Sequence, residues 1–387
     1  MQIRRCTILM LEPRERLDFD LSLIAAGGNG LRSTLQWFAL APPRDADIEL
    51  SAEEAALLGA VSPTQWSDFE ELARAHARAT LESLLAKELI LAQDSAAAAR
   101  DEMLRETHWR STSAVLHYLS RWRGIDTEAM QRDLAESGDG DLLAKLGPAP
   151  ALVRERASAA ERITLPRASD SPLDALLGRR VTCRNFDASR ALTREQFSTV
   201  LQRAWGARAV QDFAPEVPLL KKGVPSAGGL HATECYLLVQ RVEGIAPGLY
   251  HYHPVDHALE PLRLLSADEA AALARQFVAA QAYFVDAHVI AVAVSRFRRN
   301  FWKYRNHAKA YRALILDVGH ISQTQYLAAT ELGLAAFITA AINEVDIEQA
   351  FGLDALEESP LAVTGFGIRG SERREVEWDP LYTVWPR

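Results

Sequence analysis

The sequence predicts an α+β fold in which helices surround a mainly antiparallel sheet. Three observations predict it. Serine or threonine followed three residues later by glutamate or glutamine, the spacing of a capping box, marks several helix starts. Two strand-like runs at 248–252 and 258–262 flank a turn and indicate a hairpin. A Val-rich strand at 288–295 precedes a long helix at about 307–332. Helices packed around an antiparallel sheet accommodate this order.

The length of 387 residues allows two or more domains. We expect the first domain over residues 1–95. A strand should occupy its first ten residues, capping-box spacing opens helices at Ser51 and Ser67, and a strand follows at 87–92. Helix, turn, longer helix and wing-like strand are typical of a winged-helix-like module. A generic helical lobe is the alternative.

The rest of the chain predicts a connector and a larger domain. Residues 96–165 are rich in Ala, Arg, Glu and Leu, which indicates helices joining the two halves of the chain. Prolines and serines at 164–172 indicate a linker. The larger domain should cover residues 166–387. Besides the elements named above, we expect in it helices that begin near 171, 193 and 266 and strands at 234–242, 337–342 and 361–368.

Composition narrows the classes of partner. The net charge of −8 argues against broad binding to the phosphate backbone of nucleic acids. The three widely spaced cysteines suggest neither a disulfide framework nor a zinc site. No segment approaches the ~20 apolar residues that span a bilayer, and the apolar run at 1–10 is too short for a signal peptide. We therefore expect a cytoplasmic protein that binds neither nucleic acid nor a membrane.

The first candidate site is an arginine–hydroxyl–arginine pattern. Arg180, Thr182 and Arg184 follow a predicted helix at alternate positions, and Phe186 continues the pattern. Arginine suits a phosphate dianion because its planar guanidinium can donate two parallel hydrogen bonds. A solvated charge cluster is the alternative.

The second candidate site is the small-residue loop 225–229. Small side chains let backbone amides approach a ligand closely, and a turn without a ligand is the alternative. The candidate binding residues in this loop are Ser226, Ala227, Gly228 and Gly229.

The third candidate is the pair Lys303–Tyr304, a few residues before the long apolar helix. A snorkelling lysine beside a core tyrosine is the alternative. Two weaker candidates follow. Ala340 lies in a small-residue segment, 332–342, that also fits an ordinary buried strand, and Arg369 comes just after the last strand.

In this order the motifs resemble those of the SagB-type branch of the nitroreductase-like flavoproteins, from about residue 166 onwards. That branch includes FMN-dependent dehydrogenases that oxidise azoline rings to azoles in ribosomally made peptides. Many nitroreductases carry an asparagine in the small-residue loop, and its absence here favours the peptide-modifying branch. The resemblance implies that FMN is bound by Arg180, Thr182, Arg184, the 226–229 loop, Ala340 and Arg369, and that Lys303 and Tyr304 are catalytic.

The function implied by the resemblance is the oxidation of a thiazoline or oxazoline in a precursor peptide. The family fold buries much of its FMN at a subunit interface, which implies a homodimer, and a cyclodehydratase is a further expected partner. The N-terminal module could hold a leader peptide by strand addition to its wing. Two alternatives stay open: an NAD(P)H-dependent flavin reductase of quinones or nitro compounds, which would not need Lys303 and Tyr304, and a non-catalytic scaffold that recruits peptide.

Two other patterns are set aside. Residues 365–370 match G-x-G-x-x-G, but the chain that follows leaves no room for a βαβ unit. His251, His253 and His257 lack a well-placed acidic or thiolate partner for a metal. We expect no metal site.

Overall fold

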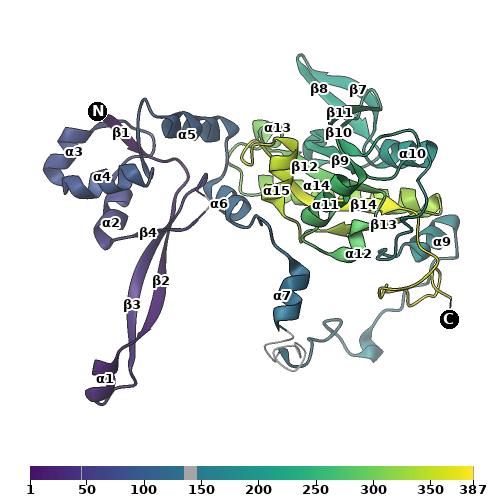
Figure 1. The fold of residues 1–387 in the computed structure, drawn as a ribbon, viewed down its shortest axis with the longest axis horizontal. Helices are drawn as coiled ribbons and strands as arrows, with labels where there is room; N and C mark the ends of the chain where they lie inside the picture. Colours follow the sequence, from purple (N-terminus) through teal and green to yellow (C-terminus); the bar gives the residue numbers. More distant parts are fainter. Residues whose placement is uncertain (45, 135–145, 387) are drawn as a thin grey trace. The chain divides into compact units, whose positions relative to one another are not determined.

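The computed structural model describes residues 1–44, 46–134 and 146–386 (Figure 1). The chain forms two compact units. The first contains Met1–Arg121, Ser295–Leu316 and Gly352–Ser359, and the second contains Trp122–Val294, Asp317–Phe351 and Pro360–Arg387. Helices and antiparallel strand pairs occur in both, which confirms the predicted α+β class.

The first unit is built on two three-stranded sheets. Their strand orders are β5-β1-β6 and β2-β3-β4. The strands are β1 (Gln2–Arg5), β2 (Met10–Phe19), β3 (Leu31–Leu40), β4 (Ile48–Leu50), β5 (Ser67–Asp68) and β6 (Ile90–Ala92). The helices are α1 (Leu21–Ala25), α2 (Ala52–Ala60), α3 (Phe69–Ala75), α4 (Arg78–Ala86), α5 (Ala96–Thr107), α6 (Ser111–Leu119) and α13 (Phe297–Lys303).

Side-chain caps mark the start of α1, α2, α3 and α5 in this unit. The Ser51 hydroxyl accepts from the Glu54 amide at 3.1 Å, and the Glu54 carboxylate accepts from the Ser51 amide at 2.8 Å, as the sequence predicts. The helix expected from Ser67 onwards is instead two helices. Asp68 caps α3, and the extended residues His76 and Ala77 separate α3 from α4. The prediction of one long helix is wrong, because the extended residues interrupt it. Phe69 is buried from α3, and Leu81 and Leu84 are buried from α4.

The strands of the module also differ from the expectation. The segment 87–92 does contain a strand, β6, but β6 pairs with β1 inside the sheet and forms no wing. The long hairpin of the unit is β2–β3, which pairs Met10 with Leu40 and Phe19 with Leu31 and carries α1 at its turn. It precedes α2 (Figure 1) and was not predicted. Residues 96–121, assigned to the connector, belong to this unit.

The second unit contains a six-stranded sheet with the order β11-β10-β9-β12-β14-β13 and a separate hairpin, β7–β8. The strands are β7 (Ala207–Ala214), β8 (Val217–Lys222), β9 (Thr233–Val239), β10 (Gly248–His253), β11 (Ala258–Leu264), β12 (Val289–Arg296), β13 (Ala335–Thr339) and β14 (Glu358–Gly367). The predicted hairpin is confirmed as β10–β11.

The second unit also contains helices. They are α7 (Thr127–Leu134), α9 (Pro172–Arg179), α10 (Arg194–Ala204), α11 (Ala267–Phe277), α12 (Ala282–Val285), α14 (Ala310–Glu331) and α15 (Glu344–Phe351). The first seven residues of α14 are grouped with the first unit. Strand β12 is buried along almost its whole length because it lies in the middle of the sheet. None of the helices in the described part of the chain combines the length and apolar character that a membrane span requires.

Candidate functional site

The arginine-rich segment is extended, and its side chains alternate between two environments. Val181, Cys183 and Asn185 are buried, whereas the residues between them are partly exposed. A bridge between Thr182 and Ala336 of β13 fixes the segment, and the Cys183 amide donates to the Ala336 carbonyl at 2.9 Å. Alternation in an extended chain places Arg180, Thr182, Arg184 and Phe186 on one face.

Arg180 and Thr182 meet at Tyr326 of α14. The Thr182 hydroxyl lies 2.9 Å from the Tyr326 hydroxyl, and the Arg180 guanidinium lies 5.3 Å from the centre of the tyrosine ring. Burial raises the pKa of Tyr326, although the hydrogen bond with Thr182 acts in the opposite direction. No carboxylate in the described part of the chain pairs with Arg180. A guanidinium and a hydroxyl on one face, with the positive charge uncompensated, suit an anionic phosphate.

Arg184 and Arg369 are held by residues that follow β14. Arg184 donates to the Val376 carbonyl at 3.1 Å, and its guanidinium lies 5.5 Å from the centre of the Tyr283 ring. Arg369 forms an ion pair with Glu377. Of the basic candidates, Arg369 is therefore the one whose charge is already compensated.

The small-residue loop is fixed to α14 through Asp317. The Ser226 hydroxyl donates to the Asp317 carboxylate at 2.6 Å and accepts from the His231 amide at 3.0 Å. The Ala227 amide donates to the same carboxylate at 3.1 Å. Gly228 and Gly229 have φ of 61° and 71°, a left-handed conformation that glycine adopts without strain. The loop thus presents backbone with almost no side-chain cover.

Within one chain, the two motifs contact opposite sides of α14. Asp317 and Tyr326 are nine residues apart, which in an α-helix corresponds to about 14 Å along the axis and roughly two and a half turns. The arginine-rich segment and the 226–229 loop are therefore both positioned by this helix, at contact points on opposite sides of it.

Ala340 is exposed and directly follows β13. Because Thr182 bridges Ala336 of the same strand, Ala340 lies beyond the end of the strand that supports the arginine-rich segment. The small-residue segment thus contains the buried strand β13 and continues into an exposed residue, Ala340.

Lys303 and Tyr304 belong to the first unit. Lys303 ends α13 and is exposed, and Tyr304 is the half-buried residue that caps the helix. The Lys303 ammonium lies 5.7 Å from the centre of the Tyr304 ring. The other side of α13 is apolar and buried through Phe297 and Phe301.

A buried aromatic cluster holds α13 in place. Trp109 lies 4.5 Å from Phe297 and 4.7 Å from Phe301, measured between ring centres. The Trp109 indole donates to the Leu356 carbonyl at 2.8 Å. His117 stacks on Trp109 and lies 3.0 Å from the Tyr311 hydroxyl and 2.9 Å from the Ala355 carbonyl through its two ring nitrogens. The helix that carries Lys303 is thus fixed by residues of α5–α6.

Acidification is expected to destabilise this unit through His117. Burial lowers its pKa to about 3, from an ordinary value of 6.5. The unfolded chain therefore binds the proton more readily, so the stability contributed by neutral His117 is complete above pH 6.5 and is lost as the pH falls toward 3. Between pH 6.5 and pH 5 the free energy of unfolding should fall by about 2 kcal/mol from this group. Urea titrations at both pH values measure the change, and a His117→Gln variant with the same pH dependence as the wild type would contradict it.

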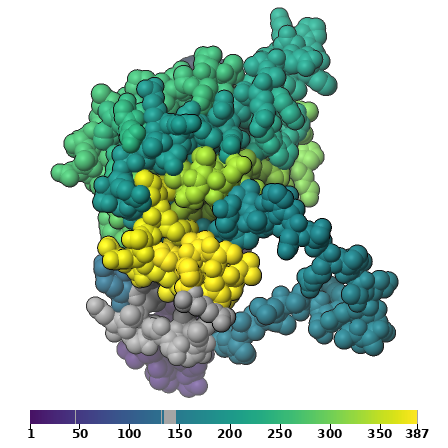
Figure 2. Space-filling model, turned by 90° about the vertical axis from the view of Figure 1, so that its right-hand side faces the viewer, coloured from purple at the N-terminus to yellow at the C-terminus, as the bar shows by residue number. Residues whose placement is uncertain are grey.

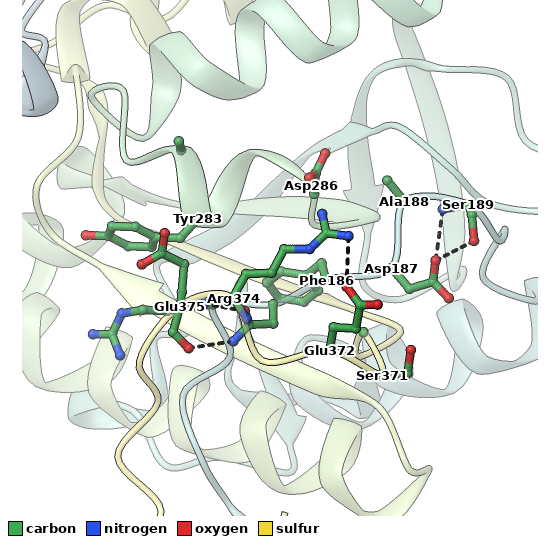
Figure 3. A pocket seen from close by; sticks show the side chains of 14 residues that line it. Phe186, Asp187, Ala188, Ser189, Tyr283, Asp286, Ser371, Glu372, Arg374 and Glu375 are labelled. Atoms are coloured by element: carbon green, nitrogen blue, oxygen red, sulfur yellow. Dashed lines mark hydrogen bonds and ion pairs between the residues drawn. The ribbon is translucent and has the colours of Figure 1, made fainter. Parts of the chain in front are cut away.

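A cavity of about 560 Å³ lies beside the arginine-rich segment (Figure 3). Its lining includes Arg184, Phe186 and Tyr283 and residues 370–372, 374 and 375, but neither Arg180 nor the 226–229 loop. Figure 3 shows Arg374 and Glu372 turned toward each other, and their ion pair measures 3.3 Å. Hydrogen bonds from Ser189 and Arg190 lower the pKa of Asp187, at the far end of the cavity, to about 2.

Sequence reasoning missed Asp317, Tyr326 and Glu377. A signal was available for Asp317, because a carboxylate inside an otherwise apolar helical stripe requires a hydrogen-bonding partner. Elsewhere, the His251 ring lies between the carboxylates of Glu234 and Glu260, at 3.1 and 2.6 Å. No group of His, Cys, Asp and Glu side chains among the described residues has the arrangement of a metal site.

Comparison with known proteins finds relatives of the second half of the chain. Residues 177–368 match the model of the nitroreductase family. The chain is 28% identical over 205 residues to a protein of Methanocaldococcus jannaschii named as a nitroreductase, covering 53% of this chain and 95% of that protein. It is 31% identical over 144 residues to the trifolitoxin-processing protein TfxB of Rhizobium leguminosarum bv. trifolii, covering 37% of this chain and 38% of TfxB.

A third relative is the microcin B17-processing protein McbC of Escherichia coli, which is 26% identical over 167 residues, covering 40% of this chain and 57% of McbC. The match therefore spans less than two thirds of either processing protein. The expected relationship to nitroreductase-like proteins, including two that process peptides, is confirmed. The chain therefore contains a nitroreductase-family domain, and the family model matches it over residues 177–368.

Proposed function

We propose that this oxidoreductase is an FMN-dependent dehydrogenase that oxidises a thiazoline or oxazoline of a ribosomally made peptide to the azole. The observation that carries the proposal is the partly exposed pair Arg180–Thr182, in which no carboxylate of the described residues compensates the positive charge of Arg180. The similarity of the chain to two peptide-processing proteins supports a peptide substrate.

The residues present fit FMN. Arg180, Thr182 and Arg184 would hold its phosphate, since guanidinium and hydroxyl groups donate hydrogen bonds to phosphate oxygens. The 226–229 loop would lie against the planar ring, because Gly228 and Gly229 place no side chain beyond their backbone amides. Ala340, at the exposed end of β13, would add a small surface on the other side of the cofactor. When bound, FMN supplies a two-electron acceptor for a hydride.

Lys303 would supply the base. Converting an azoline to an azole removes two hydrogens from the ring, one as a hydride and one as a proton. A neutral lysine amine can take the proton from the ring carbon and hold it as ammonium. Tyr304, whose ring lies against the Lys303 ammonium, would orient the amine toward the substrate.

A second copy of the chain would complete the site. Since the arginine-rich segment and the 226–229 loop contact opposite sides of α14, one chain does not bring them to one ligand. In a homodimer, the loop of one subunit can face the arginine-rich segment of the other. Arg369, already paired with Glu377, then has at most a secondary part in phosphate binding.

The purified protein is expected to be a yellow homodimer with about one FMN per chain. Because the ring and the phosphate would be held by different subunits, dissociation should release the flavin. Light scattering with absorbance detection measures both quantities over a dilution series. A stable monomer that retains FMN at micromolar concentration would contradict the shared site, and a colourless protein that FMN does not reconstitute would contradict the proposed cofactor.

The first unit would recognise the precursor peptide. The outer edge of β6 has no strand partner in the described part of the chain, so a leader peptide could extend the sheet β5-β1-β6 by one strand. A cyclodehydratase, which would form the azoline, is the partner implied by this chemistry. A deletion that removes the first unit as far as Trp109 is a poor test of recognition. It would expose Phe297 and Phe301, which Trp109 covers.

A further inference from the structure

The residues after β14 lie on the arginine-rich segment. We call residues 370–386 the C-terminal tail; it is the yellow surface in Figure 2. The Asn185 side chain connects the tail to the segment. Its amide nitrogen donates to the Glu375 carbonyl at 3.0 Å, and its oxygen accepts from the amides of Arg374 and Glu375 at 2.8 and 2.7 Å. The segment is thus covered on its buried side by the tail.

Glu377 is the centre of this contact. Its side chain is completely buried. One carboxylate oxygen accepts from the backbone amides of Arg184 and Asn185, at 2.6 and 3.1 Å, and from the Asn185 side chain at 2.8 Å. The other oxygen accepts from Arg369 and from the Trp385 indole at 2.8 Å. Five donors therefore converge on one carboxylate.

This environment keeps Glu377 ionised. Burial alone would raise its pKa, but the hydrogen bonds from the Arg184 amide and Trp385, together with the charge of Arg369, outweigh burial and lower the pKa below its ordinary value. A buried carboxylate with this set of donors is costly to remove, because the donors would be left without an acceptor.

The contact separates the two faces of the segment. The backbone amides of Arg184 and Asn185 point to Glu377, while the side chains of Arg180, Thr182 and Arg184 occupy the partly exposed face. Fixing the backbone at 184–185 therefore fixes where these three side chains point.

We propose that Glu377 is a positioning residue for the phosphate site: it holds the arginine-rich segment from behind, and it binds Arg369 so that Arg369 supports the segment and does not contact the phosphate. This inference rests on the proposed FMN site and deepens it. It assigns to the tail a part in cofactor binding although no tail residue is among those proposed to hold FMN. It also assigns to Arg369 a role different from that implied by the family resemblance.

The test compares Glu377→Gln with Glu372→Gln in the full-length protein. Both replace a tail carboxylate with an amide, but Glu372 is exposed, and among the described residues its one ion pair is with Arg374. Two quantities are measured: the Kd for FMN, from quenching of its fluorescence, and hydrogen exchange at the amides of Arg184 and Asn185 without FMN. Glu377→Gln should weaken FMN binding at least about tenfold and increase exchange at both amides, because glutamine offers the five donors one acceptor oxygen in place of two and no negative charge for Arg369. Glu372→Gln should change neither.

A milder variant and an arginine variant complete the test. Trp385→Phe removes one of the five donors and should shift both quantities in the same direction by a smaller factor, so the inference stays testable if Glu377→Gln does not fold. Arg369→Gln should increase exchange at 184–185 as Glu377→Gln does. Weaker FMN binding by Arg369→Gln with unchanged exchange would show that Arg369 contacts the phosphate and would overturn the inference.

Failure of the inference is distinguishable from failure of the proposed function. If the wild type binds no FMN, the proposed function fails, and exchange at 184–185 still reports whether Glu377 holds the segment. If the wild type binds FMN and Glu377→Gln binds it equally well, the proposed function stands and the positioning role is refuted.

Discussion

Replacing Lys303 with alanine is expected to slow peptide oxidation by about 10²–10⁴-fold, the usual contribution of a positioned acid–base group. FMN should stay bound, because every residue proposed to hold it belongs to the second unit, whereas Lys303 belongs to the first. The stability of the fold should also be unchanged, because Lys303 is exposed at the end of α13, and its helix is fixed by Phe297 and Phe301 on the other side. Single-turnover reduction of the flavin by peptide measures the loss.

Two further variants, Lys303→Arg and Lys309→Ala, separate a role as base from a role of positive charge and provide a control. Arginine keeps the positive charge but does not lose its proton, so Lys303→Arg should be as slow as Lys303→Ala. Lys309 is an exposed lysine of the same unit with no assigned role, and Lys309→Ala should oxidise peptide at the wild-type rate. Tyr304→Phe keeps the ring against Lys303 and removes the hydroxyl, which tests whether that hydroxyl takes part.

Two outcomes would contradict the assignment of the base. Near wild-type oxidation by Lys303→Arg would make the lysine an electrostatic or structural residue. If Lys303→Ala and Tyr304→Phe both remain active, the azoline-oxidase function loses its main support. The NAD(P)H-dependent flavin reductase would then be the better reading, and NAD(P)H-driven reduction of a quinone should proceed in all of these variants.

Replacing Arg180 with alanine should lower the affinity for FMN at least about tenfold, since a charge-assisted hydrogen bond contributes about 1.5–3 kcal/mol. The expectation rests on the position of Arg180, which shares a face with Thr182 and has no carboxylate partner among the described residues. Equilibrium dialysis at two salt concentrations measures the affinity, and the loss should be larger at low salt because a charge is removed.

Arg179 provides the matched control. It is the neighbouring arginine, it is exposed, and it ends α9 one residue before the segment begins. Arg179→Ala should retain FMN. Equal losses in Arg179→Ala and Arg180→Ala would mean that general positive charge at this surface, and not a phosphate contact, explains the binding.

Local patterns predicted the elements of the site well. The alternate spacing of Arg180, Thr182 and Arg184 predicts a shared face if the segment is extended, and the structure shows that it is. The long helix expected at 307–332 is α14, from Ala310 to Glu331. These predictions succeed because periodicity and capping depend on residues that are close in sequence.

The residues that contact the arginine-rich segment from distant parts of the sequence were not predictable in the same way. Tyr326 contacts Thr182 across 144 residues, and Glu377 contacts Arg184 across 193. Such pairs form only when the sheet is assembled, and no local pattern specifies them. The hairpin β2–β3 is a different case, because Gly27–Gly30 between two apolar runs is a turn signal that the sequence contains. The exposure of Lys303 at the end of α13 is likewise a property of the folded chain that the local sequence does not specify.

The central claim is that the chain oxidises an azoline with FMN. The most direct measurement incubates the FMN-loaded, full-length protein anaerobically with a precursor peptide that contains one thiazoline, and follows flavin absorbance and peptide mass together. The flavin absorbance should bleach as the peptide loses about two mass units, and Lys303→Ala should show neither change. A peptide of unchanged mass beside a flavin that NAD(P)H reduces readily would contradict it.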